Sequence, residues 1–485
     1  MSEAMRIRKN SLYSTLSISS RLIANVFIFW IIARYYGPSV FGQFTSAQVL
    51  AANFIIFADF GFDILLTTEV ARNKKNAVKL FQQFFSLKLI FNFVALIAMW
   101  CIALLGNFSM ETRALILILS FYTIFSTLSN FLFALYKGFE RLEFETQITL
   151  YMNVGLILIA LPLILFRVNI LLIACVFVLT RILGFTIGIF YSKKLLPQIS
   201  YGFLLDGFNE IKKKVLVFGF FLLFNNLFFQ MDTILLSLWR GDHEVGVYQA
   251  VFKLIMLPLI IPDIFINTLM PLLSRLNVEN YTQWKKVGNL MNKILLAVVL
   301  PVSVVLFVYS DQIIKIIYGS KDYIDAVPIL KIFAIVLFVR FSLEAYALML
   351  TTSDRQKVRL YTVLAATLLN FTINYFLIPK YGAFGTAIVS LITNVFVGLI
   401  YYLTNFNLVR QYLFNIKTLL FLLLSLGIVY LFWLNKSITV FITAPILGII
   451  FILFAYFFFF TKDERELIFS SDFRFSLFKV DKRKL

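Results

Sequence analysis

The chain has 485 residues, of which 61% are hydrophobic and 14% are charged, and soluble globular proteins do not combine these values. Apolar stretches of about 20 residues recur along the whole chain, as helices that cross a bilayer core of roughly 30 Å require. Alternating strand patterns are absent, so the sequence indicates an all-α membrane protein and argues against a β-barrel.

Turn and charge clusters divide the chain into fourteen predicted membrane spans. The basic start of the chain lacks the short apolar region and cleavage site of a signal peptide, so we expect the first span to be retained. The first eight spans lie at 12–33, 41–66, 82–105, 114–136, 148–166, 170–191, 215–238 and 246–273. Six more lie at 288–309, 328–350, 358–378, 382–404, 418–434 and 437–460.

The distribution of Lys and Arg tests this count. An even number of spans places both termini on one side, and basic residues should then concentrate in alternate connections. The terminal segments and the connections on their side hold 30 Lys and Arg residues, and the other side holds 8. The alternation predicts both termini in the cytoplasm. It also explains most of the +19 net charge, so we expect no nucleic-acid partner.

An internal repeat with an offset of 204 residues relates the two halves of the chain. YYGPSVFGQFTSAQ (35–48) joins spans 1 and 2, and WRGDHEVGVYQAVFK (239–253) joins spans 7 and 8. The offset places Gly42 on Gly246. Because six spans separate the copies, the repeat is parallel, an arrangement found in transporters that bind substrate between two halves.

The repeat predicts four segments of the chain. Two six-helix lobes, two additional transmembrane helices and a basic cytosolic tail are expected at 1–205, 206–412, 413–461 and 462–485. The outward connections are short, the longest being residues 310–327. We therefore expect a transporter and not an enzyme, because no outward domain is present that would house an active site.

Three motifs resemble those of a known family. ARYYGPSVFGQF (33–44), FADFGFDILLTTEVAR (57–72) and KYGAFGTA (380–387) resemble the polysaccharide-transport branch of the multidrug/oligosaccharidyl-lipid/polysaccharide (MOP) exporter superfamily. Within that branch the chain is most similar to bacterial O-antigen and capsule repeat-unit flippases. The resemblance covers nearly the whole chain, including the two lobes, and implies a fold like that of the multidrug and toxin extruders (MATE) of the superfamily.

The resemblance also implies a function. It implies alternating-access translocation of undecaprenyl-pyrophosphate-linked oligosaccharide from the cytoplasmic to the periplasmic leaflet of the bacterial inner membrane. A cationic central cavity would bind the substrate, and a proton or Na⁺ gradient would drive the transport in some members. The expected partners are this substrate, membrane lipids and polysaccharide-assembly proteins, and no other cofactor is expected.

Cations within the spans are the candidate substrate-binding residues. A charge at the centre of a span costs about 2.5–3.5 kcal/mol, so each should face protein or water. A helix that begins near Leu12 places Arg21 about 13 Å from its start. Arg21 and Lys253 lie in equivalent helix pairs of the two lobes, and we expect them to clamp a pyrophosphate. The predicted substrate-binding set is Arg21, Asn25, Lys88, Arg181, Gln249, Lys253 and Arg340.

Several of these cations have structural alternatives. Lys88, like Lys331, is close enough to a helix end to extend its ammonium group to the interface. Arg181 fits a structural ion pair within a lobe. Arg340 and Glu344 are four residues apart on one helical face, and form either a neutral stabilising pair or a gated pair in which Glu344 takes a proton.

Oxygen-bearing residues in the second half form a candidate site for a coupling ion or proton. The predicted set is Asp232, Glu344, Asn370, Asn374, Thr386 and Ser390. Oxygen ligands suit a hard cation, and hydrogen bonding between helices is the alternative. The acids expected to act in gating or structure are Asp59, Asp63 and Asp263.

The remaining reactive residues carry no functional prediction. His243 lies in a short outward turn without metal-ligand companions, and Cys101 and Cys175 are expected to be ordinary buried thiols, so no metal site is predicted. Two rival functions stay open at this point. A multidrug cation extruder of the same superfamily should have twelve helices and an acidic cavity, and a membrane polymerase or ligase should carry a large outward loop.

Overall fold

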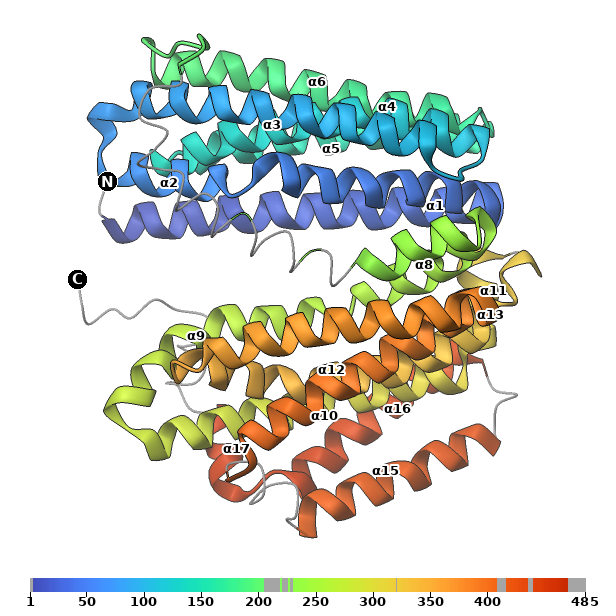
Figure 1. Cartoon of the computed structure of the whole chain (residues 1–485). Helices are drawn as coiled ribbons and strands as arrows, with labels where there is room; N and C mark the ends of the chain where they lie inside the picture. Colours follow the sequence, from blue (N-terminus) through green and yellow to red (C-terminus); the bar gives the residue numbers. More distant parts are fainter. Residues whose placement is uncertain are drawn as a thin grey trace. The chain divides into compact units, whose positions relative to one another are not determined.

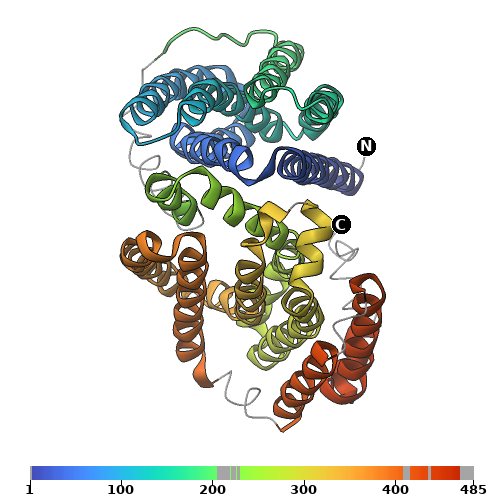
Figure 2. The same ribbon diagram turned by 90° about the vertical axis from the view of Figure 1, so that its right-hand side faces the viewer.

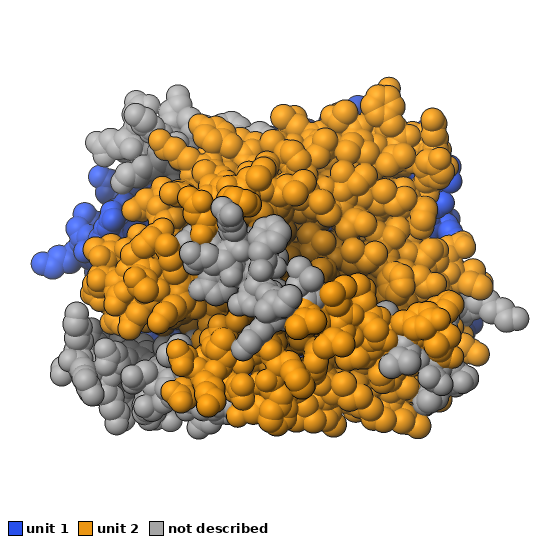
Figure 3. Space-filling model, turned by 90° about the horizontal axis from the view of Figure 1, so that it is seen from below, with its two compact units in different colours: residues 1–249 blue, residues 250–485 orange. Residues whose placement is uncertain are grey.

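The computed structural model describes residues 3–204, 219, 226, 230–319, 321–407, 416–434 and 439–469. Within these residues the regular elements are helices, without a strand (Figure 1). The chain divides into two compact units, which we name the N-terminal unit (residues 1–249) and the C-terminal unit (residues 250–485) (Figure 3). The prediction of an all-α membrane protein is therefore confirmed.

Six long helical segments form most of the N-terminal unit. Helix α4 is central and packs against α1, α2, α3, α5 and α6, whose axes run side by side when viewed end-on (Figure 2). Phe, Leu and Ile side chains from α2, α3, α4 and α5 fill its core. The elements are α1 (Glu3–Asp59), α2 (Phe62–Arg72), η1 (Lys74–Asn76), α3 (Ala77–Leu105), α4 (Met110–Gly138), α5 (Leu142–Leu165), α6 (Ile170–Leu195) and the first half of α8 (Asp242–Met256).

A backbone break at Gly37 divides α1 into the first two predicted spans. Gly37 has φ 77°, a left-handed value that only glycine adopts without strain, and Pro38 follows it. A second break with positive φ at Phe60 and Gly61 separates α1 from α2. The first segment begins at Glu3 and not near residue 12, so the helix extends well beyond the predicted start of the span.

The C-terminal unit is built around α10 and α12. Helix α12 packs against α9, α10 and α13, and α10 also contacts α15 and α16. A non-helical residue, Gly382 with φ 54°, divides α13 into the predicted spans 358–378 and 382–404. The elements are α9 (Ile260–Glu279), α10 (Tyr281–Val308), α11 (Ser310–Tyr318), η2 (Lys321–Tyr323), α12 (Ala326–Thr352), α13 (Gln356–Thr404), α15 (Ile416–Leu434), α16 (Val440–Phe454), the π-helical turn η3 (Ala455–Phe459) and α17 (Lys462–Phe469).

An ion pair attaches the short helix α17 to the body of the C-terminal unit. Lys293 Nζ of α10 donates to both carboxylate oxygens of Glu464 at 2.8 Å, and the Lys293 side chain is 8% exposed. Thr461 and Glu464 cap each other's backbone N–H groups, which fixes the first turn of α17. The described start of the predicted cytosolic tail is therefore a docked helix.

The described helices bear on the predicted number of membrane spans. Within the described residues, nine helices are long and apolar enough to cross a membrane, or ten if α8 and α9, bent by 41°, form one span. The predicted span 215–238 lies mostly outside the described residues. The total of fourteen therefore stays a prediction. The segment boundaries at 205/206, 412/413 and 461/462 also stay predictions, and the compact units meet instead at 249/250.

Gly42 of α1 and Gly246 of α8 lie at a close backbone crossing inside the N-terminal unit. A Cβ atom on Gly42 would lie 1.7 Å from the Asp242 carbonyl oxygen, and one on Gly246 would lie 1.8 Å from the Pro38 carbonyl oxygen. Asp242 follows Pro38 by the repeat offset of 204. The two contacts are therefore equivalent under the sequence repeat, and both require glycine.

We expect Gly42→Ala to destabilise the protein by about 1–3 kcal/mol, because the added methyl group overlaps backbone atoms that cannot rotate away. Gly155→Ala in α5 is the matched control, since a Cβ there would meet no atom within 4 Å. Alanine in a helix interior adds about 0.5–1 kcal/mol of stability relative to glycine. Thermal unfolding of both variants in detergent checks this, and equal melting temperatures would contradict the close crossing.

Candidate functional site

Arg21 is held between α1 and α5 in the N-terminal unit. Its Nη2 atom donates to Ser17 Oγ at 3.0 Å and to Glu145 Oε1 at 2.5 Å. The guanidinium carbon lies 5.8 Å from the centre of the Phe133 ring. The Arg21 side chain is 35% exposed, whereas Glu145 is 7% exposed. The cation is thus partly accessible, and its carboxylate partner is buried.

A second cation binds the same carboxylate. Lys137, in the last turn of α4, places its Nζ atom 3.3 Å from Glu145 Oε2, and its side chain is 46% exposed. Glu145 lies in the first turn of α5. We name Arg21, Lys137 and Glu145 the Arg21 cluster. Two cations and one carboxylate give it a net charge of +1.

The Arg21 cluster lies near one end of the helical bundle. Lys137 and Glu145 adjoin the short connection between α4 and α5, which the charge pattern predicts to be cytoplasmic. The distance along α1 from Arg21 to the break at Gly37 is about 24 Å at 1.5 Å per residue. Arg21 is therefore far inside its own helix but close to the end of the bundle, and Asn25, one turn further along, is exposed.

Sequence reasoning missed Lys137 and Glu145. Both flank a connection, and the predicted span began at residue 148, so Glu145 was assigned to the loop. In the structure α5 begins at Leu142, which brings Glu145 onto the helix. An unpaired arginine inside a span requires a counter-ion, and that requirement was the available hint to look for a nearby acid.

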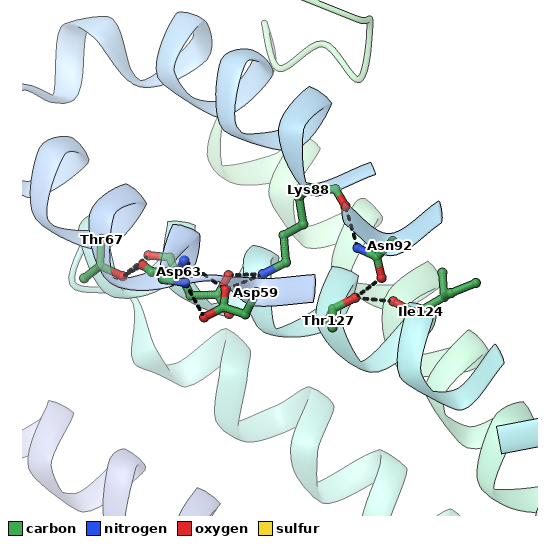
Figure 4. Close-up of polar contacts among 9 residues, drawn as sticks. Asp59, Asp63, Thr67, Lys88, Asn92, Ile124 and Thr127 are labelled. Carbon is green, nitrogen blue, oxygen red and sulfur yellow. Dashed lines mark hydrogen bonds and ion pairs between the residues drawn. The ribbon is translucent and has the colours of Figure 1, made fainter. Parts of the chain in front are cut away.

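Lys88 has a different environment, shown in Figure 4. Its ammonium group donates to Asp59 Oδ1 at 2.8 Å and also binds Asp63, and the side chain is 0% exposed. Asp59 also accepts from the backbone N–H groups of Gly61 and Asp63. The cluster thus joins α3 to the break between α1 and α2. The Lys88 ammonium group is enclosed in this structure and is not accessible to a substrate. The predicted substrate-binding role of Lys88 therefore gains no support from its position.

Arg181 contacts aromatic and sulfur groups. Its Nη2 atom donates to the Tyr122 hydroxyl at 3.2 Å, and the guanidinium carbon lies 5.0 Å from the centre of the Tyr122 ring. Its Nη1 atom lies 3.9 Å from Met152 Sδ. In the part of the chain that the structure describes, no acidic residue forms an ion pair with Arg181, so the structural ion pair considered as an alternative is not seen there.

Asp232 of the predicted coupling-ion set and Gln249 of the predicted substrate-binding set are buried and hydrogen-bonded at the end of the N-terminal unit. The Tyr248 hydroxyl donates to Asp232 Oδ2 at 2.9 Å. Gln249 Nε2 donates to Thr233 Oγ1 at 2.6 Å, and the Gln249 side chain is 1% exposed. Both bonds link α8 to the preceding helical turns.

Four charged residues interact in the C-terminal unit. Arg340 of α12 is within electrostatic range of Glu344 on the same helix and of Asp263 on α9, and the predicted pairing of Arg340 with Glu344 stays a prediction. Glu344 also interacts with Arg359 of α13, whose Nη1 atom donates to Thr351 Oγ1 at 2.6 Å. Arg359 was missed because it was counted in a connection. The four residues carry two positive and two negative charges and come from three helices.

Lys253, which the sequence predicts to bind substrate, is half-buried. It lies in the last turn of α8, which ends at Met256. Residues 257–259, which include Pro258, separate α8 from α9 and accompany the bend of 41°. The predicted clamp by Arg21 and Lys253 combines residues of two units and stays a prediction.

The predicted oxygen ligands of α13 hydrogen-bond within their own helix. Asn374 Nδ2 donates to Asn370 Oδ1 at 2.9 Å, and Thr386 Oγ1 donates to the Gly382 carbonyl at 3.0 Å. Ser390, one turn after Thr386, is half-buried. Within the described ranges no group of three His, Cys, Asp or Glu residues is placed to hold a metal ion. Coupling by an ion at these residues stays a prediction.

Two models of known protein families match this chain. The model of the polysaccharide biosynthesis protein family matches residues 7–277, which is more than half of the chain. The chain belongs to this family. A MatE family model matches residues 218–376, and together the two matches place the protein in the polysaccharide-transport branch of the MOP superfamily.

Similar proteins in bacteria agree with this family. The chain is 25% identical over 184 residues to a putative O-antigen transporter of Shigella flexneri, covering 36% of this chain and 43% of that protein. It is 28% identical over 140 residues to the teichuronic acid biosynthesis protein TuaB of Bacillus subtilis (strain 168), covering 29% of each. The matched segments thus span less than half of either relative.

Solved structures show the fold of this family member. The lipid II flippase MurJ, in an inward closed conformation, superposes with a TM-score of 0.74 at 19% identity, covering 94% of this chain and 99% of that one. An inward-facing MATE multidrug transporter gives a TM-score of 0.63 at 14% identity, covering 83% and 99%. The predicted MATE-like fold is therefore confirmed.

We name Lys88, Asp59 and Asp63 the Lys88 cluster, and its burial leads to a prediction about stability. Lys88→Met leaves two carboxylates without their cation, and breaking a buried ion pair in this way destabilises a protein by about 3–5 kcal/mol. We expect a much lower melting temperature for this variant, measured by thermal unfolding in detergent. Lys79→Met, at an exposed position of the same helix, is the control.

A second variant separates charge from packing. Adding Asp59→Asn and Asp63→Asn to Lys88→Met removes all three charges, and we expect it to restore part of the lost stability. A Lys88→Met variant as stable as Lys79→Met would show that the buried pairing does not hold the helix break.

Proposed function

We propose that this protein is a flippase for undecaprenyl-pyrophosphate-linked oligosaccharide, an O-antigen or capsule repeat unit. In this proposal it moves the lipid-linked unit from the cytoplasmic to the periplasmic leaflet of the bacterial inner membrane by alternating access, with both termini in the cytoplasm. A proton or Na⁺ gradient drives the cycle, and polysaccharide-assembly proteins receive the product. Membership of the polysaccharide biosynthesis family is the single observation that carries the proposal.

The charges of the helical bundle support an anionic substrate. The Arg21 cluster has an excess of one positive charge, and both of its cations are partly exposed. A phosphate group in a low-dielectric site needs cationic donors, since charge-assisted hydrogen bonds are roughly twice as strong as neutral ones. The C-terminal unit adds half-buried Lys253 and Arg340.

A multidrug cation extruder is the second candidate, favoured by the MatE match over residues 218–376. Such a transporter needs acidic groups for cationic drugs. The acids Asp59 and Asp63 are bound to Lys88, and Glu145 to Arg21 and Lys137. Each of these acids is thus bound to at least one cation, and the carboxylates around Lys88 are enclosed with it, which makes the extruder the weaker candidate. A polymerase or ligase is weaker still, because the similar proteins are described as transporters and flippases.

Deletion of the gene tests the proposed function. We expect surface glycan to disappear and lipid-linked units to accumulate in the cytoplasmic leaflet, where an added lectin cannot reach them on intact spheroplasts but can after lysis. Re-expression of the wild-type protein restores the glycan. Unchanged surface glycan together with new drug sensitivity would favour the extruder instead.

A further inference from the structure

The acid–base clusters around Lys88 and around Arg21 have opposite stoichiometry. In the Lys88 cluster two carboxylates bind one fully enclosed ammonium group. In the Arg21 cluster one enclosed carboxylate binds two cations that are 35% and 46% exposed. An enclosed acid between accessible cations is the arrangement expected where an external anion approaches from the exposed side.

The cations of the Arg21 cluster retain unused hydrogen-bond donors. Arginine carries five N–H donors and lysine three. Both side-chain bonds of Arg21 run through Nη2, and its Nε atom is buried without an acceptor among the described residues. A buried donor without a partner costs about 1–3 kcal/mol. Because Nε is enclosed, an external acceptor would instead meet the donors on the exposed parts of Arg21 and Lys137.

A phosphate group matches these donors better than a carboxylate does. Its oxygen atoms point in several directions, so one group can accept from the guanidinium fork and from an ammonium group at the same time. The site has a net charge of +1 before the ligand arrives, so electrostatic attraction favours an anion. Phosphate and pyrophosphate are the ligand class that fits both the geometry and the charge.

We propose that Arg21 and Lys137 form a phosphate-binding site in which Glu145 is the resident counter-ion. Without ligand, Glu145 neutralises one of the two cations and holds both in place. When a phosphate group binds, it competes with Glu145 for their donors, so the carboxylate weakens binding and speeds release. The identification of this phosphate with that of the lipid-linked substrate rests on the proposed function.

Glu145→Gln separates this role from simple positioning. The amide keeps the size of the side chain but removes the competing charge. We expect phosphate to bind roughly tenfold more tightly to this variant, which corresponds to about 1.4 kcal/mol. A residue that only positioned the cations would give weaker binding when substituted. Glu143→Gln is the matched control, since Glu143 lies in the same turn of α5 and pairs with Arg141 instead.

The binding experiment uses the full-length protein in lipid nanodiscs. Inorganic pyrophosphate is titrated against wild type, Glu145→Gln, Glu143→Gln and Lys137→Gln, with the rise in melting temperature and calorimetric affinity as readouts. A second series uses nanodiscs that contain a polyprenyl pyrophosphate. We expect Glu145→Gln to bind more tightly than wild type, Glu143→Gln to match wild type and Lys137→Gln to bind more weakly in both series. The Lys137 side chain is half-exposed, so we expect the Lys137→Gln variant to fold.

The outcomes separate the inference from the proposed function. Equal or weaker pyrophosphate binding by Glu145→Gln would overturn the counter-ion role, even if lipid-linked oligosaccharide is still translocated. Tighter binding without any translocation of lipid-linked oligosaccharide would support the site and overturn the flippase proposal. Binding of inorganic pyrophosphate but not of the lipid would overturn the link to the substrate, because the site would then take a soluble phosphate compound.

Discussion

A charge inside a membrane-spanning bundle must be paired or hydrated, and the organisation of this protein depends on how each charge meets that requirement. Lys88 is fully enclosed and bound to two carboxylates. Arg21 shares one carboxylate with Lys137 and stays partly exposed. Because desolvation makes an unpaired buried charge costly, the first arrangement serves to hold helices together, whereas the second leaves positive charge available for an anion.

Two of the buried ion pairs lie beside a backbone break or the start of a helix. Asp59 caps the start of α2 at the positive-φ residues Phe60 and Gly61 and is itself held by Lys88 of α3. Lys293 anchors α17 through Glu464, which also caps that helix. In both places a buried cation fixes the start of a helix, where backbone N–H groups lack intrahelical partners.

The fold has neighbours among both lipid flippases and multidrug transporters, so the fold alone does not select a substrate. The selection depends on the side chains at the accessible positions. In this chain the acids of the N-terminal unit that lie near cations are bound to them, and the residual charge of the accessible Arg21 cluster is positive. That balance, together with the family assignment, directs the proposal toward a phosphate-bearing lipid substrate.

The sequence by itself determined the helical membrane class and the breaks at Gly37 and Gly382, because hydropathy and glycine act locally along the chain. It also singled out Arg21 as an unusual charge. Only the tertiary structure decided that Lys88 binds Asp59 and Asp63 and that Glu145 links Arg21 to Lys137. These contacts join residues on different helices, up to 124 positions apart. Their existence depends on helix packing and on where α5 begins, which no local pattern contains.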